Sequence, residues 1–178
     1  LPLAARNPEG VLYMGSFSKV LAPGLRLGFV VAPKSVYGKL VQAKQAADLH
    51  TPSFNQRVVA EVMKDGFLAR HIPTIRTLYK NQRDAMLAAL DQEMVGLGVS
   101  WTRPVGGMFL WVQLPEGMDA QKLLPLAVER GMAFVPGAPF FPGNPQHNCL
   151  RLSYVTVPPA QIAQGIAALA AAIKAYAQ

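Results

Sequence analysis

The sequence contains almost no cysteine, no long apolar segment and little charge for its length. A single cysteine, Cys149, excludes an internal disulfide framework and predicts a reducing, cytoplasmic location. No apolar run reaches the roughly 18 residues that a membrane-spanning helix needs, so we expect no membrane partner. Residues 1–6 contain neither an initiator methionine nor a signal-peptide pattern. We therefore expect the chain to be part of a longer protein.

Charge and histidine content exclude two further classes of function. The 17 lysines and arginines outnumber the 10 acidic residues, which gives a formal net charge of +7. These basic residues are scattered along the chain, whereas a nucleic-acid interface concentrates them, so we expect no nucleic-acid partner for this segment. His50, His71 and His147 are too far apart in the sequence to indicate a metal site, and we predict none.

The first part of the chain alternates short apolar runs with helical patterns. With 51% hydrophobic residues among 178, the chain can bury the core of one domain or slightly more. Residues 11–15 and 25–32 are expected to be strands of a parallel sheet that lacks its usual neighbours. Apolar residues at helical spacing predict helices over 36–47, 54–62 and 68–94, with Pro73 in the first turn of the last one or kinking it.

The period of the apolar residues changes after residue 96. Strands are predicted over 99–102, 108–114, 133–135 and 150–154. A helix is predicted after Asp119, its expected N-cap, and a last helix opens at Pro158–Pro159. This change of period predicts two units that a long helix joins.

One loop carries residue types that suit a phosphate and an aldehyde. Ser16, Ser18 and Lys19 follow the first predicted strand, and Arg26 lies beyond a Pro-Gly turn. Hydroxyl groups, loop N–H groups and a guanidinium form a phosphate cradle, and a neighbouring lysine amine can form an imine. These three features together indicate pyridoxal phosphate. By spacing alone, a surface lysine in a polar loop explains Lys19 equally well.

A family resemblance extends along nearly the whole chain. Residues 16–28, SFSKVLAPGLRLG, resemble the cofactor-lysine signature of the fold type I, class I/II aminotransferases. Four further segments resemble family motifs in the same order: 45–56, 103–111, 134–141 and 150–154. The branch that the sequence resembles most is the 2-aminoadipate (LysN-like) branch, which includes broad-specificity relatives.

The resemblance implies an α/β fold of two parts. Residues 1–66 would be the C-terminal remnant of the large domain, which binds pyridoxal phosphate (PLP). Residues 67–178 would form the long linking helix and the small α+β C-terminal domain. The resemblance also implies PLP as the cofactor and a homodimer as the assembly.

The resemblance further implies a role for each candidate residue. Lys19 would be the Schiff-base lysine and the general acid/base that moves a proton between substrate and cofactor. The cofactor phosphate would be held by Ser16, Ser18 and Arg26. Arg151 would bind the substrate α-carboxylate, although an arginine in an alternating strand is otherwise more often a structural residue. Two readings stay open for Phe109, Phe140 and Phe141, which suit a substrate pocket and core packing equally well.

The implied function is transfer of an amino group between an L-amino acid and a 2-oxo acid. The donor would be 2-aminoadipate, glutamate or another member of a broad range. In the family, the groups that pair with the cofactor's pyridine ring precede the lysine, so we expect these 178 residues to be inactive by themselves. An alternative is the PLP-binding effector domain of a MocR-like (GntR-type) transcription regulator. A third reading is a structural or dimerisation module that leaves Lys19 unused.

Overall fold

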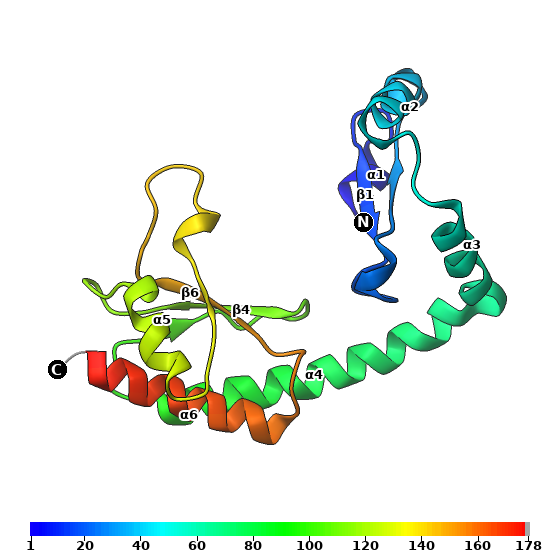
Figure 1. The fold of residues 1–178 in the computed structure, drawn as a ribbon. Coiled ribbons are helices and arrows are strands. Elements are labelled where there is room, and N and C mark those ends of the chain that lie inside the picture. Colours follow the sequence, from blue (N-terminus) through cyan, green and yellow to red (C-terminus); the bar gives the residue numbers. More distant parts are fainter. Residues whose placement is uncertain (177–178) are drawn as a thin grey trace. The chain divides into compact units, whose positions relative to one another are not determined.

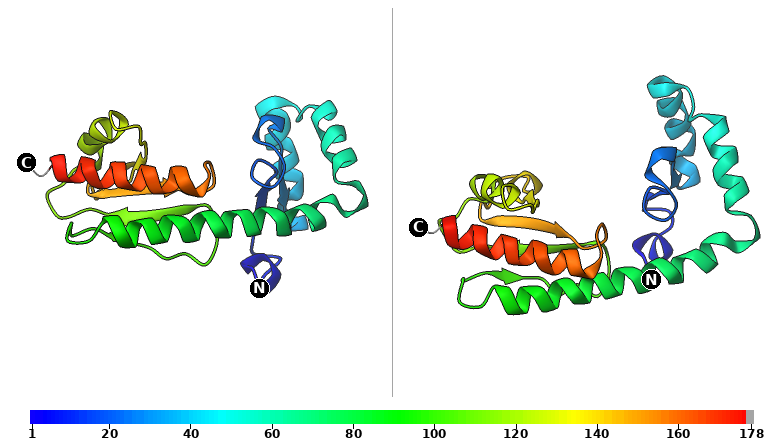
Figure 2. Two further views of the ribbon diagram at one scale, coloured as in Figure 1. Left: turned by 90° about the horizontal axis from the view of Figure 1, so that it is seen from below. Right: turned by 60° about the horizontal axis from the view of Figure 1, so that its bottom comes forward.

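The computed structural model describes residues 1–176, which form two compact units (Figures 1 and 2). The first unit is Leu1–Pro73, and the second begins at Thr74. The change from one unit to the other falls inside the long helix α4 (Phe67–Glu93), whereas the predicted boundary at residue 66 precedes this helix. The assignment of the two parts to a large and a small domain stays a prediction.

The first unit consists of a strand pair followed by helices. Strands β1 (Tyr13–Ser16) and β2 (Gly28–Val31) pair with Tyr13 opposite Val31 and Ser16 opposite Gly28. The pairing is antiparallel, so the expectation of two parallel strands is wrong, because the short loop between them reverses the chain instead of crossing over. The other elements of this unit are α1 (Leu3–Arg6), η1 (Pro23–Leu25), α2 (Lys34–Asp48), α3 (Ser53–Val62) and η2 (Lys64–Gly66).

Apolar side chains remain exposed on this strand pair. Met14, Val30 and Val31 are all more than half exposed, and no residue of α2 is buried. Two strands without a third neighbour cannot cover an apolar face by themselves. This agrees with the expectation that these strands lack neighbours which a longer chain would supply.

The second unit is a four-stranded antiparallel sheet with helices. The strand order is β3-β4-β6-β5, and every neighbouring pair is antiparallel. The strands are β3 (Ser100–Trp101), β4 (Phe109–Gln113), β5 (Val135–Pro136) and β6 (Cys149–Ser153). The C-terminal part of α4 joins them, together with α5 (Ala120–Val128), η3 (Ala138–Phe140) and α6 (Pro159–Tyr176).

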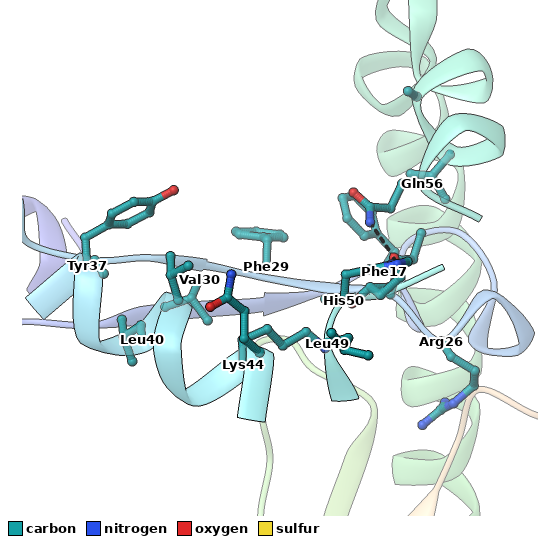
Figure 3. A pocket seen from close by; sticks show the side chains of 18 of the residues that line it. Phe17, Arg26, Phe29, Val30, Tyr37, Leu40, Lys44, Leu49, His50 and Gln56 are labelled. Carbon is teal, nitrogen blue, oxygen red and sulfur yellow. Dashed lines mark hydrogen bonds between the residues drawn. The ribbon is translucent and has the colours of Figure 1, made fainter. Parts of the chain in front are cut away.

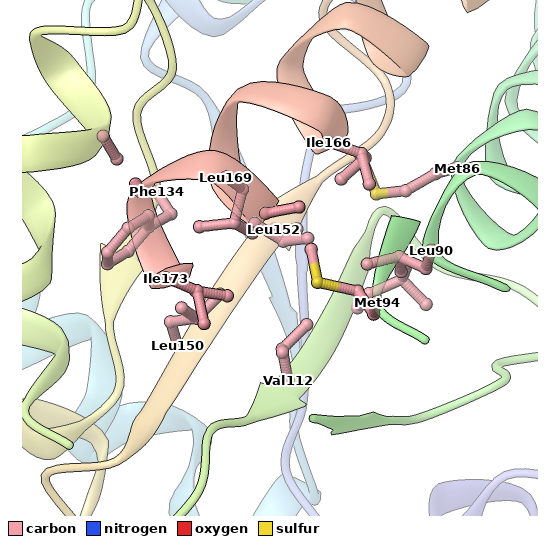
Figure 4. Packing of buried hydrophobic residues seen from close by; sticks show 14 of the residues in the cluster. Met86, Leu90, Met94, Val112, Phe134, Leu150, Leu152, Ile166, Leu169 and Ile173 are labelled. Atoms are coloured by element: carbon pink, nitrogen blue, oxygen red, sulfur yellow. The ribbon is translucent and has the colours of Figure 1, made fainter. Parts of the chain in front are cut away.

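One face of this sheet forms the main core. Alternate residues of the two central strands, among them Val112, Leu150 and Leu152, are buried and point toward the helices (Figure 4). Ile166 and Leu169 of α6 pack against them, and α4 and α5 complete the cluster. Because side chains alternate along a strand, the residues between these positions lie on the opposite face of the sheet.

The sequence predicted the N-cap of α5 and the position of Pro73 in α4. Asp119 is the N-cap of α5, and its carboxylate accepts a hydrogen bond from the Gln121 N–H at 2.8 Å, which confirms the prediction. Pro73 lies inside α4, beyond its first turn, so the alternative that places it in the first turn is wrong, because the helix already begins at Phe67. Among the described residues, no helix is both long enough and apolar enough to span a membrane.

Candidate functional site

The strand pair of the first unit positions the lysine loop. The Phe17 N–H donates to the Leu27 carbonyl at 3.1 Å and extends the pairing one step beyond β1 and β2. The Phe17 carbonyl then accepts hydrogen bonds from the N–H groups of Leu21 and Ala22, at 2.9 and 3.2 Å. These bonds close a turn over residues 17–22, and Lys19 lies within it.

The polar groups of this loop are available to a ligand. The Lys19 side chain is exposed, and its amino group has no hydrogen bond or ion pair within residues 1–176. The Ser16 hydroxyl accepts the Ser18 N–H at 3.1 Å, which fixes the backbone just before the lysine. Two hydroxyl groups and an unpaired ammonium group together favour an anion.

Arg26 occupies the other side of the same loop. Its backbone is left-handed, with φ of 51°, and its guanidinium donates to the Pro23 carbonyl at 3.2 Å. Ser16 pairs with Gly28 and the Phe17 N–H bonds to the Leu27 carbonyl, so Arg26 directly precedes the residue that closes this end of the strand pair. The fold thus brings the four candidate residues of this loop to one end of the strand pair.

A residue of α3 supports this loop. The Asn55 side-chain amide donates to the Leu25 carbonyl at 3.1 Å, and the contact is partly buried. This bond holds the segment that carries Arg26 against the helix. No local sequence pattern predicts this bond, because it joins residues 30 positions apart.

A large groove lies beside the loop in the first unit (Figure 3). Its volume is about 1150 Å³, and its lining comes from β2, α2 and α3, with Phe29, Val30 and Leu40 among the apolar side chains. Arg26 reaches its edge, whereas Ser16, Ser18 and Lys19 do not line it. The groove therefore meets the lysine loop at Phe17 and Arg26, but not at the two serines or the lysine.

Arg151 lies on the second unit, on the face of the sheet opposite the main core. The strand register places it opposite Trp111 on one side and Val135 on the other. The side chain is half-buried, and it has no hydrogen-bond or ion-pair partner in the described part of the chain. An arginine in this state keeps its N–H donors free for an external carboxylate.

Aromatic rings surround the Arg151 guanidinium. Its central carbon lies over the Phe109 ring at 4.0 Å from the centroid and over the Phe140 ring at 4.9 Å. Phe109 is 38% exposed and Phe140 is 49% exposed, so neither ring belongs to the core. This exposure excludes packing into the core for Phe109 and Phe140, whereas both readings stay open for Phe141. Phe141 is half-buried and contacts Trp111.

The loop between β3 and β4 is held by two side chains of the second unit. Arg83 donates to the Pro104 carbonyl at 3.2 Å, and the Tyr154 hydroxyl donates to the Gly106 carbonyl at 3.3 Å. Burial raises the pKa of Tyr154, and the charge of Arg83 opposes that effect. Hydrogen bonds from Lys80 and then Arg83 lower the pKa of Asp84.

The family model described as "Aminotransferase class I and II" matches residues 1–169. The chain belongs to the aminotransferase class I and II family. The resemblance inferred from the lysine segment and four further motifs is thus confirmed, and so is the α/β, fold type I class.

Several members of this family are close relatives. The 2-aminoadipate transaminase of Thermus thermophilus is 52% identical over 165 residues, which cover 93% of this chain and 41% of that protein. Aromatic-amino-acid aminotransferase 1 of Thermococcus litoralis is 46% identical over 174 residues, which cover 97% of this chain and 42% of that protein. The crystal structure of LysN, an alpha-aminoadipate aminotransferase of T. thermophilus complexed with N-(5'-phosphopyridoxyl)-L-leucine, has a TM-score of 0.91 at 49% identity. The match covers 97% of this chain and 44% of the LysN chain.

The similarity also extends to regulators. The uncharacterized HTH-type transcriptional regulator YdfD of Bacillus subtilis is 32% identical over 177 residues, which cover 99% of this chain and 36% of that protein. The chain spans about two fifths of the length of the first curated relatives that it matches.

Family membership identifies PLP as the cofactor, and the lysine loop fits it. Ser16, Ser18 and Arg26 offer donors to a phosphate, while Lys19 offers an exposed amine without a partner in the described part of the chain. Residues 1–176 contain no group of three or more metal-ligating side chains.

Proposed function

We propose that the full-length protein is a PLP-dependent aminotransferase that moves an amino group between an L-amino acid and a 2-oxo acid. The observation that carries this proposal is the exposed Lys19 at the polar end of the strand pair, with Ser16, Ser18 and Arg26 beside it. When bound, the cofactor supplies an electron sink that acidifies the α-carbon of an attached amino acid.

Each residue of the loop has a task in this proposal. Lys19 would hold the cofactor aldehyde through its Nζ, and the same nitrogen would accept the proton of the substrate α-carbon. Arg26 and the two serine hydroxyls bind the phosphate as charge-assisted and neutral hydrogen-bond donors.

Arg151 is the proposed binding residue for the substrate carboxylate. Its planar donor fork matches a carboxylate bidentately, so we propose that it holds the α-carboxylate of both donor and acceptor. The donor is proposed to be 2-aminoadipate, glutamate or another amino acid of a broad range. The relatives' names, which include 2-aminoadipate and aromatic amino acids, support a broad range. We also propose a cytoplasmic homodimer.

Trapping of the cofactor tests the central residue. The full-length protein is incubated with PLP, reduced with borohydride and digested, and the modified lysine is located by mass spectrometry. A pyridoxyl group on Lys19 is the expected result, and the matched variant Lys19→Arg should carry none. A folded protein with an unmodified Lys19 would reject the mechanism and favour a structural module.

The second candidate function is a PLP-sensing domain of a MocR-like transcription regulator. It is favoured by the similarity to the HTH-type regulator YdfD, although the identity of 32% is lower than the 52% shared with the transaminase. A panel of amino donors and 2-oxo acids separates the two functions. Turnover of the full-length protein supports the enzyme, whereas cofactor attachment without turnover, together with a DNA-binding N-terminal segment, supports the regulator.

A further inference from the structure

We propose that Phe109 and Phe140 are positioning residues that hold the Arg151 guanidinium ready for a carboxylate. The inference rests on the proposed function of Arg151 in substrate binding. It explains how this arginine is held: two aromatic rings lie where an acidic side chain pairs with many other arginines.

The contacts come from separate elements of the second unit. Phe109 opens β4, and Phe140 ends η3, so the two rings reach the guanidinium from a strand and from a loop helix. The guanidinium carbon lies 4.0 Å from the Phe109 centroid and 4.9 Å from the Phe140 centroid. Both distances are well within the roughly 6 Å at which a cation and a ring attract each other.

The Phe140 ring is itself held in place. Trp111 contacts it edge-on, with the centroids 5.8 Å apart, and Trp111 also lies opposite Arg151 in the sheet register. At the start of η3, the Gly137 N–H donates to the Cys149 carbonyl at 2.7 Å. Strand β6 therefore anchors both the arginine and the segment that carries one of its rings.

The absence of an acid beside Arg151 gives these rings their importance. In the described part of the chain, the ion pairs of the arginines involve Arg83 with Asp84 and Arg103 with Asp91, and none involves Arg151. A carboxylate of the protein would fix the guanidinium but would also occupy its donors and cancel its charge. Aromatic rings restrict the side chain through their faces and leave the N–H groups free for a ligand.

The inference predicts an effect on binding and not on chemistry. Without a ring, the long arginine side chain must lose more rotamer freedom when the substrate binds, so affinity falls. The proton transfer at Lys19 does not use these rings, so its rate with bound substrate should be retained. We expect a loss of about 3- to 10-fold in donor affinity for each ring removed, in line with the strength of such contacts.

The test uses the full-length holoenzyme and four variants: Phe109→Leu, Phe140→Leu, Phe109→Tyr and Phe140→Tyr. The first half-reaction is followed by the change in cofactor absorbance at increasing L-glutamate or L-2-aminoadipate concentration. This separates the apparent Kd of the donor from the maximal rate. The Tyr variants are the matched controls, because they keep the ring, and both phenylalanines are exposed enough to accept a hydroxyl group.

The Leu variants should have a higher donor Kd than the parent protein. Their maximal rate and cofactor absorbance should stay within about 2-fold of the parent values. The Tyr variants should have the same donor Kd as the parent. A second readout without turnover is competition by glutarate, which lacks the amino group; its inhibition constant should rise by the same factor. If one Leu variant does not fold, the variant at the other ring decides the test.

Two outcomes would overturn the inference. One is an unchanged donor Kd in the Leu variants, and the other is an equal loss in the Tyr and Leu variants, which indicates a packing defect. Arg151→Lys, measured in parallel, separates this failure from a failure of the proposed function. If Arg151→Lys itself leaves the donor Kd unchanged, Arg151 does not bind the carboxylate and the proposed substrate site is wrong.

Discussion

The Phe17 N–H and the Leu27 carbonyl, 3.1 Å apart, form the hydrogen bond that closes the end of the β1–β2 pair. This bond brings the serine-lysine turn and Arg26 to the same end of the strands, although Arg26 comes eight positions after Ser18 in the sequence. The proposed phosphate cradle is therefore a property of the antiparallel register. A shift of that register by one residue would turn the neighbouring side chains to the other face.

Arg26 combines a proposed function with a cost in backbone energy. Its φ of 51° is in the left-handed region, which costs a residue other than glycine roughly 1–2 kcal/mol. In the full-length protein, Arg26→Ala and Arg26→Gly should both lower PLP affinity about tenfold or more, because each removes a charge-assisted donor. Only the glycine removes the strain, so Arg26→Gly should be about 1 kcal/mol more stable than Arg26→Ala. Fluorescence titration with PLP and urea unfolding measure the two effects, and equal stability of both variants would contradict the strain.

Gly137 lies where the chain passes close to β6. A Cβ atom at this position would be 2.7 Å from the Cys149 Cβ and 2.8 Å from the Cys149 carbonyl oxygen. Gly137→Ala should therefore cost about 1–3 kcal/mol of unfolding free energy, because backbone must move to relieve the contact. Gly143→Ala in the same loop is the control, since a Cβ there meets nothing within 4 Å. The control should change stability by less than about 0.5 kcal/mol. Urea unfolding of the full-length variants measures both, and similar losses at the two positions would contradict the prediction.

Burial of Tyr154 predicts a dependence of stability on alkaline pH. Burial raises the pKa of this phenol in the folded state above its ordinary value near 10. The unfolded chain therefore loses the proton first. The stabilisation is fully present below about pH 10 and is lost as the pH rises through the folded-state pKa.

Tyr154→Phe checks this dependence. The variant loses the hydrogen bond to the Gly106 carbonyl and should be less stable at neutral pH. Its unfolding free energy should nevertheless decrease less between about pH 9 and pH 11 than that of the parent protein. Urea unfolding at several pH values measures both slopes. Parallel slopes would show that another group causes the alkaline loss.

The 178 residues by themselves are expected to lack transaminase activity. The chain spans 41% and 42% of the two transaminases compared with it, and apolar side chains of β1 and β2 stay exposed. The purified 178-residue chain should therefore give no detectable 2-oxo acid from glutamate or 2-aminoadipate, in an assay where the full-length protein is active. Turnover by the purified chain at a rate near that of the full-length protein would refute this expectation.

Several features could be predicted from the sequence because they depend on residues that are close together in the chain. The helical spacing of Val36 and Leu40 predicted α2, and the Asp119 carboxylate predicted the start of α5, because both depend on residues within a few positions of each other. The alternation of Leu150, Arg151 and Leu152 likewise predicted a strand with the arginine turned away from the apolar residues. The family was recognised from five motifs in order, and the comparison with the family model confirmed it.

The tertiary structure decided what depends on distant residues. The antiparallel pairing of β1 with β2 contradicts the expected parallel sheet, since a strand's partner is determined by the path of the loop and not by its own composition. The Asn55 contact to Leu25 and the two rings beside Arg151 join segments that are distant in the sequence or lie on separate elements. The sequence by itself thus determined the residue types of the lysine loop and of β6, because hydrogen-bonding capacity and side-chain alternation are local. Only the fold decided which side chains surround them, because those contacts exist only after the strands have paired.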